Sequence, residues 1–119
     1  MKFDSQFEER VWAAARKGKT TYHPKPFPYT IERKYTSDFM VKAKKNKKIY
    51  VETKGYFTPA DRSKLLRVRH FHPEIDLRLV FQRASNTLSK KSSTTYGEWC
   101  NKHGFKWAEA FIPEEWYNE

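Results

Sequence analysis

Two acidic residues and a lysine lie on neighbouring stretches that both have the side chains of β-strands. Asp38 belongs to residues 35–41, while Glu52 and Lys54 belong to residues 49–55. Alternating β-branched and aromatic residues predict a strand for each stretch, and a hairpin between them brings Asp38 opposite Glu52. Two carboxylates that face each other destabilise a strand pair unless positive charge lies between them. Lys54 supplies one such charge, and a divalent cation would supply another.

An aspartate on one strand, followed by Glu-x-Lys on the next, is similar to the PD-(D/E)xK pattern of metal-dependent nucleases. The same residues also fit an exposed set of charges that Lys54 bridges, because a chain with 24 Lys plus Arg contains Glu-x-Lys by chance. The pattern alone leaves both interpretations open, so the rest of the sequence has to decide between them.

The charge of the chain predicts a polyanionic partner. The net charge is +10, and residues 1–72 hold 18 Lys and Arg against 7 Asp and Glu, whereas residues 73–119 hold 6 against 7. A basic part of this kind is typical of a surface that binds nucleic acid. A solvated basic surface that aids solubility is the alternative.

Length and composition limit the class of protein further. The 119 residues suit one domain with one core, and the single cysteine excludes an intramolecular disulfide and a multi-cysteine zinc site. The sequence has no apolar run long enough to span a bilayer, and its first residues lack the apolar segment of a secretory signal. We therefore expect no membrane partner and a cytoplasmic location.

The first part of the chain predicts a helix over residues 4–17, because apolar side chains recur there at helical spacing. Ser5 and Glu8 fit a capping box at its start, which gives Glu8 a structural role without chemistry. Residues 20–23 fit a short strand.

A stiff arm is expected next, at residues 23–29. Three prolines stand there at alternate positions, where they neither continue a helix nor donate to a sheet. The arm is either a rigid surface loop or a connection that carries the preceding helix onto another subunit. We expect His23 to be a loop residue, not a metal ligand, since no second His or Cys stands at ligand spacing.

The remainder alternates strands and helices, which predicts an α/β fold with a mixed sheet flanked by helices. Thr58 and Pro59 begin a helix that Pro73 stops, and residues 76–82 fit a buried strand. Strand, helix and strand in this order favour parallel pairing of 49–55 with 76–82. Further elements are expected as a polar loop at 83–94, a helix over 95–103, an extended piece at 105–107 and a closing turn at 113–116.

The lysine-rich residues 42–48 form the tip of the expected hairpin. Contact with phosphates and a solubilising edge explain such a tip equally well. The helix after residue 58 carries Arg62, Lys64 and Arg67 outside its apolar side, which favours contact with a phosphate backbone.

Several blocks of the sequence resemble the phage endonuclease I family, the enzymes of short-tailed phages that resolve Holliday junctions. The blocks are Tyr-Thr-Ser-Asp-Phe (35–39), Val-Glu-Thr-Lys-Gly (51–55), Asp-Arg-x-Lys (61–64), His-Pro-Glu-Ile-Asp-Leu-Arg-Leu-Val-Phe (72–81), Thr-Tyr-Gly-Glu-Trp-Cys-Asn-Lys-His-Gly (95–104) and Ile-Pro-Glu-Glu-Trp (112–116). Phe-Glu-Glu-Arg-Val (7–11) is similar to the start of the family's catalytic helix. Ser37 stands where the family pattern has proline.

The resemblance implies a single nuclease domain over residues 1–119, built on a restriction-endonuclease-like core at residues 35–119. It also implies a homodimer in which residues 1–23 are exchanged between subunits through a bridge at 24–34. A Holliday-junction-resolving, Mg²⁺-dependent endonuclease acting on branched double-stranded DNA is therefore expected, in the host cytoplasm if a phage encodes it. A nicking or mismatch endonuclease on the same core and a non-catalytic DNA-binding module are the alternatives.

For the site, the resemblance implies a composite of two chains, with two Mg²⁺ ions that Mn²⁺ can replace. The expected catalytic residues are Glu8 of one chain and Asp38, Glu52 and Lys54 of the other, and the expected metal ligands are Asp38, Glu52, Thr53 through its carbonyl, and Glu8. Lys54 would orient or deprotonate the attacking water, or neutralise charge on the phosphate. The residues expected to contact DNA are Lys2, Lys25, Arg33, Lys34, Arg62, Lys64, Arg67, Lys90 and Lys91.

Overall fold

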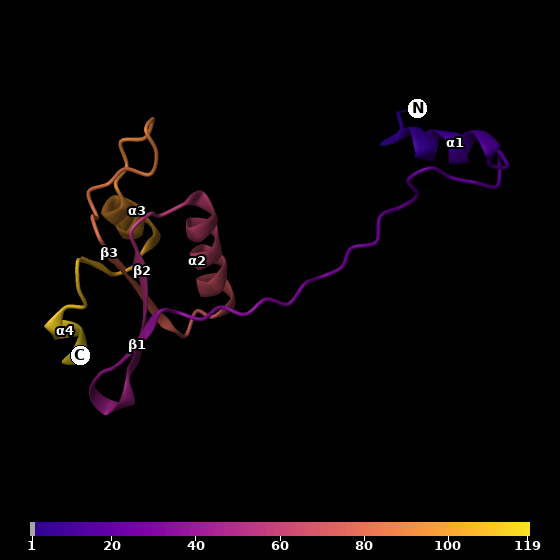
Figure 1. Ribbon diagram of the computed structural model, residues 1–119. Coiled ribbons are helices and arrows are strands. Elements are labelled where there is room, and N and C mark those ends of the chain that lie inside the picture. The colour runs from indigo at the N-terminus through magenta and orange to yellow at the C-terminus, as the bar shows by residue number, and fades with distance from the viewer. Residues whose placement is uncertain (1) are drawn as a thin grey trace. The chain divides into compact units, whose positions relative to one another are not determined.

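A computed structural model describes residues 2–119 (Figure 1). The chain divides into two compact units, one that ends at Arg33 and one that comprises Lys34–Glu119. The first unit contains helix α1 (Gln6–Ala14), and the second contains a four-stranded sheet with helices α2 to α4. Within the described residues, no helix has the length and apolar character to cross a membrane.

Helix α1 is shorter than expected. Its start is as predicted, because the Ser5 hydroxyl accepts a hydrogen bond from the Glu8 N–H at 3.1 Å. The other half of the capping box does not form, since the Glu8 carboxylate accepts from the Tyr22 hydroxyl instead. The chain becomes extended at Ala15, with φ −72° and ψ 153°, and this ends the helix.

The strand expected at residues 20–23 is wrong, and these residues are irregular. Tyr22 packs its ring edge on Phe3 at 4.8 Å between ring centroids, and His23 has φ 48°, a left-handed conformation that breaks an extended chain. Residues 24–37 have neither helix nor strand, as the prolines predict for the first of them.

The sheet of the second unit is mixed, with the order β1-β2-β3-β4. The hairpin joins β1 (Phe39–Lys42) to β2 (Lys48–Lys54) in antiparallel pairing through a short 3₁₀ turn, η1 (Lys44–Asn46). Strand β2 pairs in parallel with β3 (Asp76–Phe81), which confirms the predicted parallel neighbours. Strand β4 (Trp107–Glu109) continues the sheet in parallel beside β3.

Two strand boundaries differ from prediction. The first strand begins at Phe39, not at residue 35. The Ser37 hydroxyl donates to the Phe39 carbonyl at 2.9 Å, and this local hydrogen bond competes with strand pairing in the residues before Phe39. The last strand begins at Trp107, two residues later than expected. The Phe105 N–H donates to the Cys100 carbonyl, so this residue still belongs to the end of the preceding helix.

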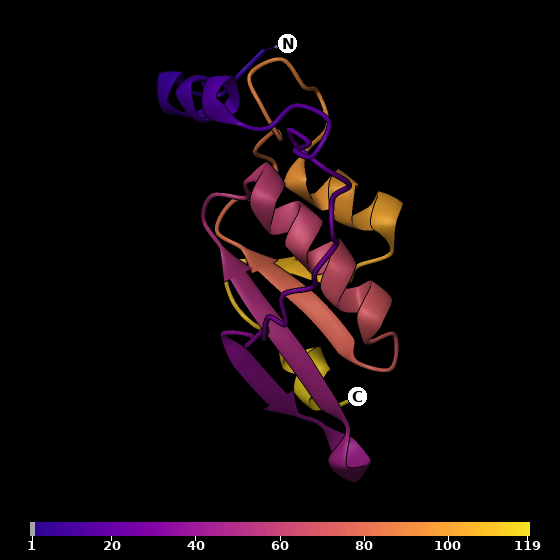
Figure 2. The ribbon, with the colours of Figure 1, turned by 90° about the vertical axis from the view of Figure 1, so that its right-hand side faces the viewer.

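Helices cover both faces of the sheet. Helix α2 (Pro59–Phe71) and helix α3 (Tyr96–His103) lie on one face, and the short α4 (Glu114–Tyr117) lies on the other (Figures 1 and 2). Complete capping boxes at Thr58 and Thr95 begin α2 and α3, and Gly104 ends α3 with φ 76°. These helix starts and the glycine stop confirm the predictions.

Each face of the sheet has its own hydrophobic core, since successive side chains of a strand point to opposite faces. The larger core lies under α2 and α3 and includes Leu79 and Phe81 of β3, Leu65 of α2, and the fully buried Cys100 of α3. The smaller core lies under α4 and consists of Val41, Ala43, Ile49, Val51, Val80 and Trp116.

A buried arginine links β3 to the last residues of the chain. The Arg78 side chain has no exposed surface, donates twice to the Asp76 carboxylate at 2.8 Å, and donates to Glu119 at 2.6 and 2.7 Å. Its guanidinium also lies over the Trp116 ring, 5.0 Å from the centroid. Arg78 and then Lys47 lower the pKa of Glu119 to about 2. The arginine is therefore fully paired despite its burial.

Replacing Arg78 by alanine is expected to lower the free energy of unfolding by about 3–5 kcal/mol, the usual cost of removing one partner from a buried ion pair. Asp76 and Glu119 would then repel each other across the space that the guanidinium filled. Urea denaturation measures the loss, with exposed Arg83→Ala as the matched control. A loss no larger than that of the control would show that the network does not stabilise the fold.

Candidate active site

The structure brings the two predicted carboxylates together at one end of the β1–β2 hairpin. The register pairs Phe39 with Val51, so that the next pair outward consists of Asp38 and Glu52. One carboxylate oxygen of Asp38, Oδ2, accepts hydrogen bonds from both the backbone N–H and the hydroxyl of Thr53, each at 2.9 Å. The Asp38 side chain is thus fixed against the backbone of β2, next to Glu52.

The two carboxylates differ in their electrostatic environment. Glu52 is only 7% exposed, and this burial, together with the neighbouring Asp38 carboxylate, raises its pKa. The Thr53 N–H lowers the pKa of Asp38. The Tyr35 hydroxyl donates to Glu52 Oε2 at 2.7 Å, and burial and this bond raise the pKa of Tyr35. Opposite shifts in adjacent acids are typical of functional sites.

Lys54 is held by the start of α2. Its ammonium lies 3.2 Å from Asp61 Oδ1, while Asp61 Oδ2 accepts from the Thr58 N–H at 3.0 Å. Burial acts to raise the pKa of Asp61, but the Thr58 donors and Lys54 outweigh it and hold the pKa below its usual value. Alternation along β2 places Lys54 on the same face as Glu52. A cavity of about 310 Å³ opens at this end of β2, lined by Thr53, Lys54, Gly55, Val80, Gln82 and Ala110.

Sequence reasoning missed the contributions of Tyr35 and Asp61. Tyr35 belonged to the expected first strand and carried no separate prediction. Asp61 appeared only within the Asp-Arg-x-Lys block, and the structure places it in the first turn of α2. The ion pair between its Oδ1 and Lys54 depends on how α2 packs beside β2, which the sequence does not show.

Glu8 lies in the first unit, within a cluster of polar side chains. Its Oε2 accepts from the Tyr22 hydroxyl and lies 3.9 Å from His23 Nε2, which is 3.3 Å from Asp4 Oδ2. The ligand atoms of Asp4, Glu8 and His23 lie within 4.8 Å of one another. His23 lies outside any helix or strand, as expected for a loop residue, and its left-handed backbone stacks the ring on Tyr22 beside the two acids. That it is not a metal ligand stays a prediction.

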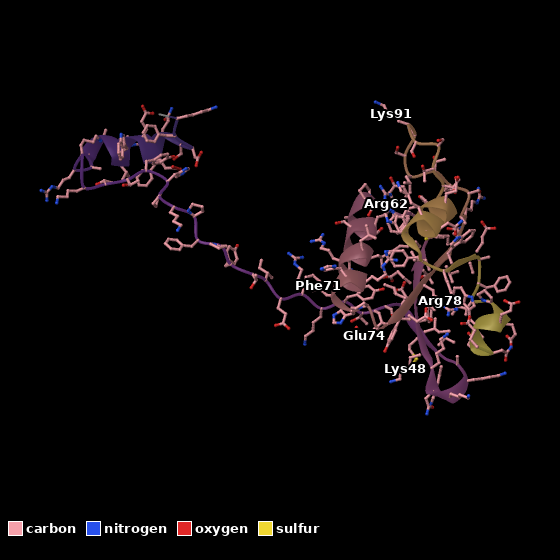
Figure 3. The ribbon with its side chains drawn as sticks, turned by 180° about the vertical axis from the view of Figure 1, so that it is seen from behind. Lys48, Arg62, Phe71, Glu74, Arg78 and Lys91 are labelled. Carbon is pink, nitrogen blue, oxygen red and sulfur yellow. The ribbon has the colours of Figure 1, made fainter. Side chains whose placement is uncertain are left out.

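The residues expected to contact DNA are exposed, with one exception. Arg62 is half-buried and donates to the Phe57 carbonyl at 2.8 Å, so part of its guanidinium holds the loop before α2. Lys64 extends over the Tyr35 ring, 5.4 Å from the centroid, beside the acidic pair. Figure 3 shows Arg62 on α2 and Lys91 on the loop after β3. The other exposed candidates are Lys2, Lys25, Arg33, Lys34, Arg67 and Lys90.

Adjacent carboxylates can hold the divalent cations that phosphatases, polymerases and nucleases use. Comparison with known proteins identifies the class as bacteriophage endonucleases: the family model for phage endonuclease I matches residues 2–119. The chain belongs to the phage endonuclease I family, which confirms the resemblance seen in the sequence.

Two relatives show how much of the family's length the chain covers. Endonuclease I of Escherichia phage T7 is 43% identical over 104 residues, which are 85% of this chain and 67% of the T7 protein. Endodeoxyribonuclease 1 of Enterobacteria phage T3 is 45% identical over 89 residues, which are 72% of this chain and 56% of the T3 protein. The chain therefore aligns with less than two thirds of the T3 protein.

Proposed function

We propose that this chain is a Mg²⁺-dependent endonuclease that cleaves branched DNA, four-way junctions included. The observation that carries the proposal is the adjacent pair Asp38 and Glu52, one held by Thr53 and the other buried with a raised pKa. Family membership and the names of the phage relatives support the nuclease activity. A phage enzyme of this kind would act in the host cytoplasm.

The donor atoms of the acidic pair fit a hard divalent cation. Among the described residues, only one oxygen of each carboxylate accepts a hydrogen bond, which leaves Asp38 Oδ1 and Glu52 Oε1 without a donor. Carboxylate and carbonyl oxygens are the ligands that Mg²⁺ and Mn²⁺ prefer. Asp38, Glu52 and the Thr53 carbonyl would hold one ion, and Glu8 would serve a second.

Hydrolysis forms a bond between phosphorus and a water oxygen and breaks the bond to one bridging oxygen of the backbone. The water gives up a proton to solvent, and the leaving oxygen takes one from solvent. Bound Mg²⁺ would supply an acidic water and a counter-charge for the phosphate oxygens. The Lys54 ammonium forms an ion pair with the Asp61 carboxylate at 3.2 Å. We therefore assign Lys54 to neutralising charge on the phosphate. Tyr35 keeps Glu52 in place through its hydroxyl.

The second part of the proposal is a homodimer that exchanges its first units. Phe27, Tyr29 and Ile31 are 85, 84 and 63% exposed, and their alternate positions place them on one side of an extended segment. An exposed apolar row of this length favours cover by another chain. A second copy would provide it, and Glu8 would then act beside the partner's acidic pair.

One cleavage assay tests the proposed activity. Purified protein is incubated with a labelled four-way junction and with linear duplex of the same length, in Mg²⁺ and in EDTA. We expect paired cuts in the junction with Mg²⁺ and none in EDTA. Cleavage that persists in EDTA would overturn the metal mechanism, and equal cutting of both substrates would replace junction resolution with general nicking. Binding without any cleavage would leave only a DNA-binding module.

A further inference from the structure

We propose that the tip of the β1–β2 hairpin, residues 42–48, is a second DNA-contacting surface, which holds a duplex arm that extends from the acidic pair. The proposal rests on the proposed function and adds a site to it. The hairpin projects past the helices of the second unit (Figure 2).

The tip concentrates like charge in a way that a free hairpin would not favour. The register places Lys42 directly opposite Lys48 in the strand pair, and Lys44, Lys45 and Lys47 lie between them. Like charges directly opposed across two strands are destabilising. The cost is removed when a polyanion lies against the pair.

Most of these lysines have no carboxylate partner. Lys47 is neutralised by Glu119 at 2.9 Å and by Asp76 at 3.5 Å. Within residues 34–119, no carboxylate lies within 4.0 Å of the other four ammonium groups. Lys42, Lys44, Lys45 and Lys48 are all exposed. The unpaired charge of the tip is therefore available to phosphates.

The backbone of the tip is held in one conformation. The Ala43 N–H donates to the Lys47 carbonyl at 2.7 Å, and the Lys44 N–H donates to the Glu119 carbonyl at 2.8 Å. Lys45 and Asn46 have positive φ angles of 56° and 63°. Asparagine adopts this conformation readily, whereas lysine keeps it only where the surroundings impose it. A preformed tip loses less conformational entropy when it binds.

The direction of the hairpin joins the tip to the acidic pair. Lys48, Glu52 and Lys54 are separated by even numbers of residues along β2 and therefore lie on one face of the sheet. At about 3.3 Å per residue, Lys48 is about 13 Å from Glu52. This spacing corresponds to about four base pairs of a duplex. Figure 3 places Lys48 at the opposite end of the second unit from Arg62.

The test compares two double variants with the same change in charge. In Lys42→Gln/Lys48→Gln the opposed pair is removed, and in Lys102→Gln/Lys106→Gln two exposed lysines outside the hairpin are removed. Affinity for a four-way junction with long arms is measured in EDTA over a range of salt concentrations. Thermal unfolding shows whether both variants fold, and we expect the hairpin variant to be at least as stable as the unmodified chain, because a repulsion is lost.

The hairpin variant is expected to bind between about tenfold and sixtyfold more weakly at 0.1 M salt, and to reduce the slope of log affinity against log salt by about 1.8. The control variant should change both much less. Equal behaviour of the two variants would overturn the proposal and assign the tip to solubility. The proposed function fails on a different result: the unmodified chain would bind the junction in EDTA and would not cleave it in Mg²⁺.

Discussion

Replacing Glu52 by glutamine is expected to abolish cleavage and, in the same variant, to raise the thermal stability of the metal-free protein. Glutamine offers one weak neutral oxygen where the carboxylate binds a cation. Metal-ion catalysis supplies several kcal/mol, so the rate should fall about a thousandfold or more. Binding of the junction should survive, because a group that repels phosphate has been removed.

The gain in stability follows from the raised pKa of Glu52. Burial and the Asp38 carboxylate make the folded chain bind this proton more tightly than the unfolded chain. The unmodified protein therefore loses stability as pH rises from the ordinary value of a glutamate to the higher folded value. The variant lacks this loss. The lowered pKa of Asp38 acts in the opposite direction and in a lower window, so its stabilisation is lost only as pH falls through its folded value.

Thermal unfolding in EDTA between pH 4 and 8 and a cleavage assay in Mg²⁺ measure the two effects, the pH range being about that in which carboxyl groups titrate. Glu74→Gln is the matched control, because its side chain is 68% exposed and lies outside the site. Normal cleavage by the Glu52 variant would remove it from the metal site. A lower melting temperature than that of the unmodified chain would show that the buried carboxylate is not destabilising.

Mixing two inactive variants is expected to restore nicking from an undetectable level. If Glu8 acts on the partner's acidic pair, a dimer of Glu8→Ala and Asp38→Ala chains has one site with both carboxylates and one site with neither. Random pairing after co-refolding makes half of the dimers mixed, so about a quarter of the sites of the unmodified enzyme are regained. Nicked junctions should appear without paired cuts, as seen on a denaturing gel.

The matched control refolds the double variant Glu8→Ala/Asp38→Ala with the unmodified chain. In an exchanged dimer, each site of the mixed species lacks one carboxylate, and its nicking activity disappears. If Glu8 works within its own chain, the two results reverse: the single variants stay inactive together, and the double variant leaves one good site. A monomer in sedimentation at micromolar concentration would also remove the exchange.

Much of the second unit was predictable because its determinants are local. Thr58 and Thr95 begin their helices through side chains that bond within the same turn, and Gly104 ends a helix by its own backbone freedom. The mostly apolar sequence of β3, which Arg78 interrupts, follows from burial on both faces. The hairpin register followed from the pairing of the two predicted strands, which places Asp38 opposite Glu52.

The remaining features depend on contacts between distant residues. Tyr35 meets Glu52 across 17 positions, and Tyr22 meets Glu8 across 14, so neither bond is visible in a local pattern. The latter contact also explains why the predicted capping box of α1 stays incomplete. The proposed metal ions, the exchange of first units between two subunits and the contacts with DNA remain predictions, since they involve molecules beyond one chain.

The burial of Cys100 in α3 makes the rate of thiol modification a measure of how often the fold opens. Its side chain has no exposed surface, and burial raises the pKa of the thiol to about 12. Because the thiolate is the reactive form and both burial and the raised pKa disfavour it, alkylating reagents react with Cys100 extremely slowly in the native state. Because the chain has a single cysteine, modification follows one rate. That rate reports the openings of the chain that expose Cys100, and a junction that binds only the closed form would slow it by the factor by which binding disfavours opening.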